Sequence, residues 1–103
     1  DSVGQTVDIY LLAVGDVSNA AAVLADNLRN DCPSLRIESH CGGGSFKSQI
    51  KKADKSGAVV ALILGEQEVV SSTVGVKYLR QEHTQETVVQ DSLATLLNNF
   101  FTN

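Results

Sequence analysis

The chain has 103 residues, a length that suits one hydrophobic core and is too short for two. Hydrophobic residues make up 43% and charged residues 19% of the chain, which is typical of a folded globular domain and excludes a disordered segment. The formal net charge of −4 argues mildly against a nucleic-acid partner, unless the basic residues gather on one face.

We expect a soluble, cytoplasmic protein without a membrane partner. No apolar run approaches the roughly 18 residues that a membrane span needs, and the first residues show no export signal. The sequence contains no methionine, which indicates that residues 1–103 form a single domain cut from a longer protein. Cys32 and Cys41 are too few for a disulfide scaffold, and His40 beside Cys41 supplies too few ligands for a metal site.

The first half of the chain alternates strands and helices. Residues 7–14 form an apolar run that predicts a buried strand. Ser18 is expected to cap a helix that ends before Pro33 and buries one apolar side, composed of Ala21, Leu24, Ala25 and Leu28. Residues 35–39 alternate apolar and polar side chains, which is typical of a strand at the edge of a sheet.

A second helix and the central strand follow the glycines at 42–44. Ser45 is a plausible cap, and the helix should end near Gly57 with Phe46, Ile50 and Ala53 turned inward. Residues 58–65 form the most hydrophobic run in the chain and predict the central strand. The order strand, helix, strand, helix, strand implies parallel strands joined by right-handed crossovers.

The last third predicts two more strands and a helix. Residues 73–79 and 86–89 are strand-like, but the polar stretch at 80–85 is too short for a crossover helix, so one of these strands runs antiparallel. Asp91 is expected to cap a final helix whose apolar side carries Leu93, Leu96, Leu97 and Phe100. The predicted fold is therefore α/β, with three α/β/α layers and a mixed five-stranded sheet containing one antiparallel strand.

Two features of the second helix could bind anions. The glycines at 42–44 precede its N-terminus, where backbone N–H groups favour a phosphate, although a tight turn is the favoured interpretation of these glycines. Their spacing matches neither the dinucleotide fingerprint nor the phosphate-binding loop. Lys47, Lys51 and Lys55 recur at intervals of four and form a basic stripe, which is either a nucleic-acid contact or an ordinary solvated face.

A third candidate site follows the central strand. Glu66 and Glu68 lie at its carboxyl end, the usual location of function in open α/β sheets. No nucleophile or histidine accompanies them, so we assign no catalytic residue, and they either solubilise a loop or accept hydrogen bonds from an unstacked guanine. Lys77 and Arg80, on and after the next strand, either lie near that loop or protect a sheet edge.

These motifs together resemble one family. The segment Gly42-Gly43-Gly44-Ser45-Phe46-Lys47-Ser48-Gln49, followed by Ala53-Asp54-Lys55, Gly57-Ala58 and Leu64-Gly65-Glu66-Gln67-Glu68, resembles the C-terminal domain of bacterial histidyl-tRNA synthetases. The resemblance extends back to Val7-Asp8-Ile9-Tyr10-Leu11 and forward through Val76-Lys77-Tyr78-Leu79-Arg80 to Asp91. It implies a mixed five-stranded sheet with helices on both faces, as the pattern of elements does.

The resemblance also implies a function, which is binding of the histidine tRNA anticodon stem and loop. By similarity to related class II synthetases, Glu68 and Lys77 read anticodon bases, with Glu66 and Arg80 beside them. Related proteins often carry arginine at the position of Lys77, and lysine keeps the charge but lacks the planar, two-pronged donor. Lys47, Lys51 and Lys55 are expected to contact the tRNA backbone.

The remaining expectations concern catalysis, cofactors and oligomeric state in the parent protein. The motifs of class II catalysis have no counterpart here, so we expect no cofactor and no aminoacylation in this domain. ATP with Mg²⁺ belongs to the parent's catalytic domain, which is a partner of this domain in the same chain, and the parent is expected to be a homodimer. The alternatives are a regulatory module that binds a nucleotide or phosphorylated metabolite at the glycine turn, and a purely structural packing unit.

Overall fold

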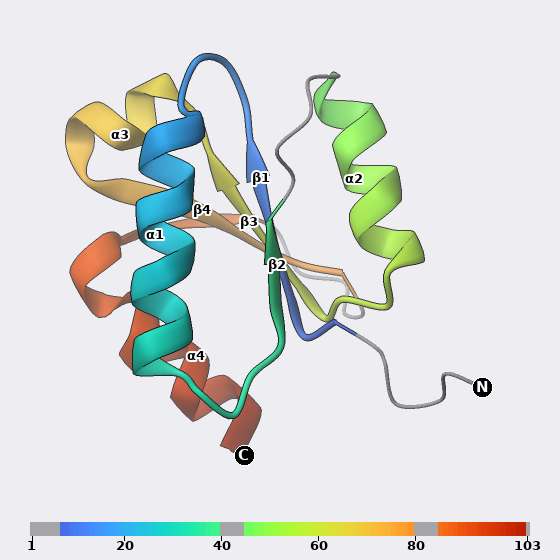
Figure 1. Ribbon diagram of the computed structural model, residues 1–103, viewed down its shortest axis with the longest axis vertical. Helices are drawn as coiled ribbons and strands as arrows, with labels where there is room; N and C mark the ends of the chain where they lie inside the picture. The colour runs from blue at the N-terminus through green and yellow to red at the C-terminus, as the bar shows by residue number, and fades with distance from the viewer. Residues whose placement is uncertain (1–6, 40–44, 80–84, 103) are drawn as a thin grey trace.

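The sheet at the centre of the molecule has five strands. A computed structural model describes residues 7–39, 45–79 and 85–102. In chain order its elements are β1 (Ile9–Ala13), α1 (Ser18–Asp31), β2 (Ile37–Ser39), α2 (Phe46–Lys55), β3 (Val60–Leu64), α3 (Glu66–Ser71), β4 (Thr73–Tyr78), β5 (Glu86–Val89) and α4 (Gln90–Thr102) (Figure 1). The strands lie in the order β2-β1-β3-β4-β5, which confirms the prediction that residues 58–65 hold the central strand.

The direction of each strand follows from its connection. β1 pairs in parallel with both β2 and β3, whereas β4 is antiparallel to both β3 and β5. One strand, β4, therefore runs against the others, as predicted. The chain moves outward from β1 to β2 through α1 and returns across β1 to β3 through α2. Because both crossovers are right-handed, these two helices cover opposite faces of the sheet.

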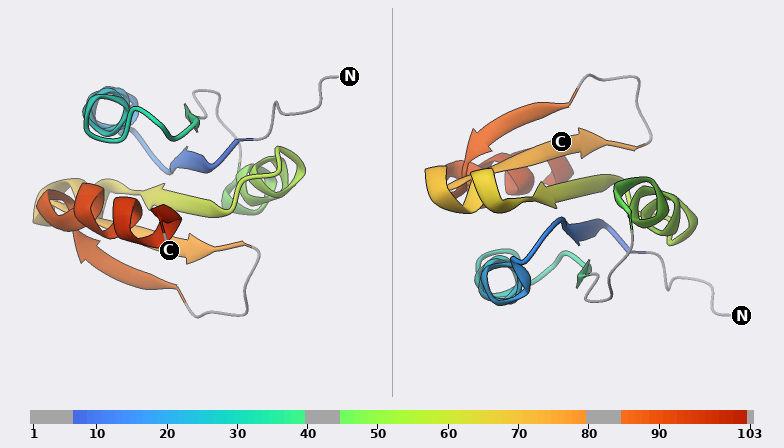
Figure 2. Two further views of the ribbon diagram at one scale, coloured as in Figure 1. Left: turned by 90° about the horizontal axis from the view of Figure 1, so that it is seen from below. Right: turned by 90° about the horizontal axis from the view of Figure 1, so that it is seen from above.

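The two faces bury cores of different size. On one face α1 and α4 pack over a large cluster rich in leucine and valine, which includes Leu11, Leu24, Leu62 and Leu97. On the other face α2 covers a smaller cluster made of Val7, Tyr10, Leu12, Ala53, Ala58 and Ala61. The views along the sheet show α1 and α4 on one side and α2 on the other (Figure 2). The expected three-layer α/β/α architecture is confirmed.

Cys32, directly after α1, belongs to the larger cluster. It is a free cysteine whose side chain is fully buried, and its Sγ lies 3.9 Å from the carbonyl oxygen of Ala94 in α4. Burial raises the pKa of the thiol, and the nearby Asp31 carboxylate raises it further. The thiol therefore behaves as a small apolar group between α1 and α4.

Two of the expected helix caps lie inside their helices instead, while the Ser45 cap is confirmed. The Ser45 hydroxyl accepts a hydrogen bond from the Ser48 N–H at 3.2 Å. Ser18, however, is the first residue of α1, and the helix starts from buried Val17, whose carbonyl accepts from the Ala21 N–H. Asp91 likewise lies in the first turn of α4 rather than at its cap, because β5 leads directly into the helix at Gln90.

The prediction that Phe46 faces inward on α2 is wrong. Phe46 is 40% exposed, whereas Gln49 is 2% exposed and takes its place against the sheet. The Gln49 amide donates a hydrogen bond to the Ala13 carbonyl at the end of β1, with a nitrogen to oxygen distance of 2.9 Å. This bond orients α2 so that Gln49, Ile50 and Ala53 face the sheet and Phe46 lies outside the core.

Residues 66–71, expected as a loop, form the short helix α3. None of its residues is buried, so burial does not explain the helix. Its first turn is stabilised instead by the Glu68 carboxylate, which accepts a hydrogen bond from the Gly65 N–H. Ser72 ends the helix in the left-handed conformation, with φ of 59°. Among the described residues, no helix has the length and hydrophobicity to cross a membrane.

Candidate nucleic-acid interface

The carboxyl ends of β1 and β3 lie side by side, and the segments that follow them are joined by Glu66. Glu66, the first residue of α3, accepts a hydrogen bond from the Asp16 N–H in the loop after β1, at 3.3 Å. In the same loop Gly15 has φ of +88° and approaches the Glu66 side chain closely, so a Cβ there would lie 3.1 Å from the carboxylate. The Glu66 side chain thus holds the β1–α1 loop against the start of α3.

Glu68 has a comparable local role at Gly65. One of its carboxylate oxygens, Oε1, lies 2.9 Å from the Gly65 nitrogen. A Cβ on Gly65 would approach this oxygen to 2.7 Å, so a larger residue there would displace the end of the Glu68 side chain from its present position. A carboxylate has about four acceptor positions, so the cap leaves Glu68 able to accept hydrogen bonds from a ligand.

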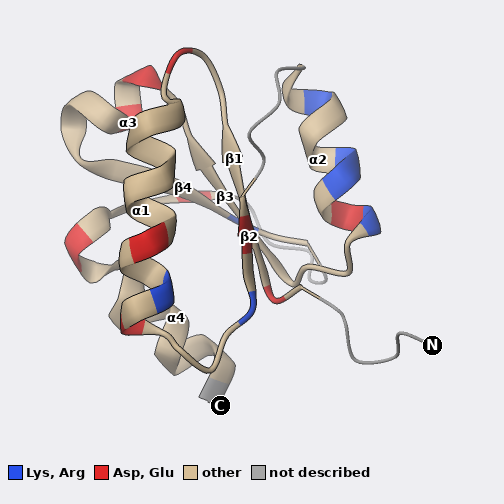
Figure 3. Ribbon diagram, viewed as in Figure 1, with Lys and Arg blue, Asp and Glu red and all other residues tan. Residues whose placement is uncertain are grey.

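The predicted lysine stripe lies on the exposed side of α2. Lys47, Lys51 and Lys55 are all exposed, as is Lys52 beside them. These four lysines share the helix with one acidic residue, Asp54, so the formal charge of α2 is 4 − 1 = +3. Figure 3 shows these basic residues gathered on α2, while acidic residues predominate on α1 and α3. The net charge of the chain therefore conceals a local basic surface.

Lys77 lies on the same face of the sheet as α2. It pairs with Ala61, a member of the small cluster beneath α2, and its side chain is half-buried. On this face the residues Gly75, Lys77, Thr87 and Val89 of β4 and β5 form what we call the sheet shelf. Thr87 is exposed and Val89 is 51% exposed, which shows that none of the described helices covers the outer part of this face.

The register separates Lys77 from the two glutamates along the strand. Lys77 is opposite Ala61, and the four residue steps from Ala61 to Gly65 span about 13 Å along an extended strand. The glutamates lie at the carboxyl edge of β3, and Lys77 lies further down the shelf. A ligand that contacts both would have to extend along β4, as a run of several unstacked nucleotides does.

Some sequence predictions fall outside the described residues. Arg80, the second basic candidate after β4, lies there, as do the glycines at 42–44 and Cys41. The interface assembled from the described residues thus consists of α2, the sheet shelf and the start of α3. In this part of the chain no group of histidine, cysteine, aspartate and glutamate side chains is arranged to hold a metal ion.

Two contributions to this surface are not evident from the sequence. The first is Gln49, which positions the lysine helix, and the four-residue spacing between Gln49 and Ala53 is the signal that could have indicated an inward side chain. The second is the sheet shelf, because whether a helix covers β5 depends on where α4 packs. The chain turns from β5 into α4 on the opposite face, and this leaves the shelf open.

Comparison with known proteins identifies the family of this domain. A family model described as "Anticodon binding domain" matches residues 8–99. The chain belongs to this family of anticodon-binding domains. The sheet shelf and the lysine helix are thus features of a domain whose family is defined by binding RNA at the anticodon.

Individual relatives of this anticodon-binding domain are synthetases. It is 47% identical over 96 residues to a protein named histidine–tRNA ligase from Hydrogenovibrio crunogenus, covering 92% of this chain and 22% of the relative. The structure of apo histidyl-tRNA synthetase from S. aureus matches with a TM-score of 0.74 and 25% identity, over 93% of this chain and 24% of that one. The domain spans about a quarter or less of these longer proteins.

The fold itself is shared at lower identity. Histidyl-tRNA synthetase from Nostoc sp. PCC 7120 matches with a TM-score of 0.83 at 20% identity, covering 92% of this chain and 22% of that one. The mixed sheet with helices on both faces is therefore the common architecture of these domains, as the sequence pattern predicts.

Proposed function

We propose that this domain binds the anticodon stem and loop of a histidine tRNA as one part of a histidyl-tRNA synthetase. The observation that carries the proposal is the 47% identity to a histidine–tRNA ligase across nearly the whole domain. The charge distribution supports it, because α2 has a formal charge of +3 in a chain whose net charge is −4. RNA binding requires a basic surface of this kind on at least one face.

The residues divide into two roles. Lys47, Lys51 and Lys55 contact phosphates along the stem, where a charge on a flexible chain suffices. Glu68 accepts hydrogen bonds from the edge of an unstacked base, with Lys77 reaching the same loop from the shelf. Glu66 keeps the β1–α1 loop in place beside the bases, and Arg80 follows Lys77 in the chain.

For the parent protein we propose the reaction after which its relative is named, that of a histidine–tRNA ligase. The parent joins histidine to its tRNA, and the catalytic domain of the same chain holds ATP and Mg²⁺. We further propose that the parent works as a homodimer in the cytoplasm. In this scheme the present domain supplies no reacting group, and its contribution is to hold the anticodon end of the tRNA.

A titration with a labelled histidine tRNA anticodon stem-loop tests the proposal. We expect weak binding at low salt, since the domain is acidic overall, with an affinity that falls as salt concentration rises. Replacing the three stripe lysines with glutamine should reduce the slope of log affinity against log salt by about one per lost phosphate contact. Affinity that is independent of salt and of the anticodon sequence would contradict the proposal.

The helix offers a matched control. Lys52→Gln removes one charge from the same helix but lies outside the stripe at 47, 51 and 55, so it should change the slope less than any single stripe variant. Equal effects at all four positions would indicate attraction to the helix in general rather than a defined contact. Thermal unfolding of each variant checks that the fold is unchanged.

A further inference from the structure

A side-chain amide lies on the middle of the sheet shelf. Gln85, the residue before β5, extends over Gly75 of β4, and a Cβ on Gly75 would lie 2.9 Å from the Gln85 Nε2 atom. Alanine at position 75 would therefore displace the amide from its present position. The backbone of Gly75 does not itself need glycine, because its φ is not positive. In the interior of a strand, such a glycine marks a close approach by another group, which here is the amide.

The amide lies between the two ends of the shelf that are expected to contact bases. Gly75 precedes Lys77 by two residues, and it pairs with Ile63, which precedes Gly65 by two residues. Each of these steps spans about 6–7 Å of extended strand. The amide therefore lies about midway between Lys77 and the edge where Glu68 caps the start of α3.

The chemistry of the amide suits the edge of a nucleotide base. Its NH₂ group donates hydrogen bonds and its carbonyl oxygen accepts them, whereas a carboxylate only accepts and an ammonium group only donates. Glutamine can thus make two hydrogen bonds to one base. Gln85 is exposed, so a ligand on the shelf can reach it. Glu68, Gln85 and Lys77 follow one another along the shelf, as do the three bases of an anticodon whose nucleotides are unstacked.

From this geometry we propose that Gln85 reads the middle base of a bound anticodon, through hydrogen bonds between its amide and the edge of that base. Gly75 is a positioning residue, since it leaves the space in which the amide lies. The inference rests on the proposed function, because it requires that the shelf binds the anticodon. It adds a third base contact between those of Glu68 and Lys77.

Competition between stem-loops that differ only at the middle anticodon base tests the proposal. Gln85→Ala should reduce the preference for the histidine anticodon over the altered one by about tenfold, with little change at the first and third bases. Gly75→Ala should cause most of the same loss while Gln85 is still present. The double variant should then discriminate no less than Gln85→Ala alone, because both changes remove one contact. Thermal unfolding checks that each variant is folded.

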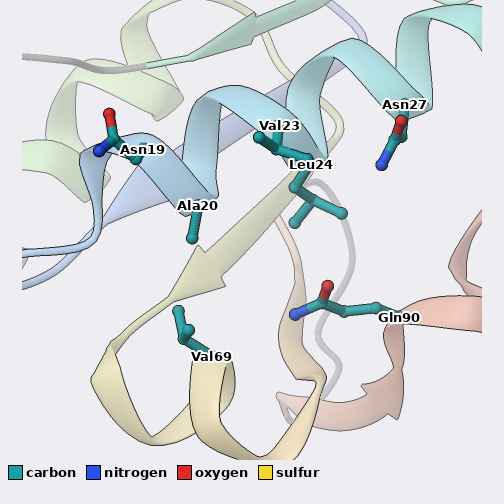
Figure 4. A pocket seen from close by; sticks show the side chains of 7 residues that line it. All are labelled: Asn19, Ala20, Val23, Leu24, Asn27, Val69 and Gln90. Carbon is teal, nitrogen blue, oxygen red and sulfur yellow. The ribbon is translucent and has the colours of Figure 1, made fainter.

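Asn27→Ala is the matched control, because it removes an exposed amide from the opposite face of the sheet. Asn27 lies on α1 and lines a groove of about 300 Å³ between α1 and α3. In this groove Ala20 of α1 lies across from Val69 of α3 (Figure 4). The sheet separates the groove from the shelf, so Asn27→Ala should bind and discriminate the stem-loops as the wild-type domain does.

The possible failures are distinguishable. If the wild-type domain discriminates between the stem-loops and Gln85→Ala does so equally well, the inference is wrong and the proposed function stands. An affinity loss that is the same for every anticodon also overturns the inference, because Gln85 would then contact the RNA backbone or only cover Gly75. If no stem-loop binds to the wild-type domain, the proposed function fails and the inference fails with it.

Discussion

The two faces of the sheet differ in what they bury and in what they expose. The α1–α4 side buries a large cluster of leucine and valine side chains, while the α2 side buries mainly alanines with Tyr10 and Leu12. The α2 side, which has the smaller core, has the more basic surface, because α2 carries four lysines and one aspartate. The domain therefore draws most of its stability from one layer and most of its basic surface from the other.

This division lets the basic surface vary without loss of the fold. Exposed lysines contribute little to stability, so the core does not fix their number or position. The helix that carries them is held by few apolar contacts, and the buried Gln49 bond to β1 fixes its position. The following variants test how far the two layers are independent.

The largest effect is expected in the α1–α4 layer. Leu97→Ala removes a fully buried side chain and should lower the free energy of unfolding by roughly 2–5 kcal/mol. Ile50→Ala on α2, a half-buried position, should cost about half as much, because less apolar surface leaves water there. Urea unfolding measures both, and a larger loss for Ile50→Ala would contradict the proposed division of stability.

A smaller effect, on both stability and binding, is expected at Gln49. Gln49→Leu keeps the approximate volume but deletes the bond to the Ala13 carbonyl, so it should lower the free energy of unfolding by about 1–3 kcal/mol. Since the bond positions α2, stem-loop affinity should fall although no lysine is changed. If affinity is preserved while stability falls, Gln49 supports the core alone.

At Glu68 the expected effect on stability is smaller still. Measuring binding specificity separates its role as the cap on Gly65 from its proposed role in reading bases. Glu68→Ala removes the cap on Gly65 and should cost about 1 kcal/mol of stability. Glu68→Gln keeps an oxygen that can accept from the Gly65 N–H but loses the charge. We expect both variants to discriminate less between the histidine anticodon and an altered one, measured by competition. Discrimination that survives in Glu68→Ala would remove this residue from the set that reads bases.

The smallest effect concerns Tyr78, which packs against Phe100 on the α4 side. Burial and the 2.7 Å hydrogen bond to Glu86 raise the pKa of Tyr78 to about 12. Because the neutral phenol is favoured in the fold, this contribution is complete below the unfolded pKa of about 10 and is lost as pH rises toward 12. In the Tyr78→Phe variant, the free energy of unfolding should therefore depend less on pH between about 10 and 12.

Absorbance of tyrosinate near 295 nm follows the ionisation directly. Glu86→Gln is the matched control, since it keeps an acceptor for the phenol and removes the charge. It should lower the pKa of Tyr78 toward its ordinary value without abolishing the shift, because burial is the larger cause. A pKa that stays near 10 in the wild-type domain would contradict the assignment.

The helices and strands were largely predictable, because the spacing of apolar residues and the positions of turn-forming residues can be read from short stretches of sequence. The strand at Glu86–Val89 begins and ends where predicted, and β4 runs antiparallel as the short connection requires. The orientation of α2 was not predictable, because Phe46 is more hydrophobic than Gln49 and tertiary hydrogen bonding decides between them. Helix α3 was missed for a similar reason, since a side-chain cap rather than apolar burial stabilises it.

For the binding surface, the sequence predicts the lysine stripe correctly because helical spacing alone places Lys47, Lys51 and Lys55 on one side. The relation between Lys77 and the glutamates depends on strand register, which the sequence leaves undefined. The groove between α1 and α3 also escapes prediction. It exists only because Val69 on one helix lies across from Ala20 on another.

Because the Cys32 thiol is buried, the rate of its chemical modification can report how often α1 and α4 separate. Its sulfur is enclosed between α1 and α4, so a thiol reagent reaches it only when these helices separate. In a Cys41→Ser background, the rate of modification therefore counts openings of the leucine-rich layer. Adding the anticodon stem-loop should leave that rate nearly unchanged if binding is confined to the lysine face, and this gives a kinetic assay that needs no label on the RNA.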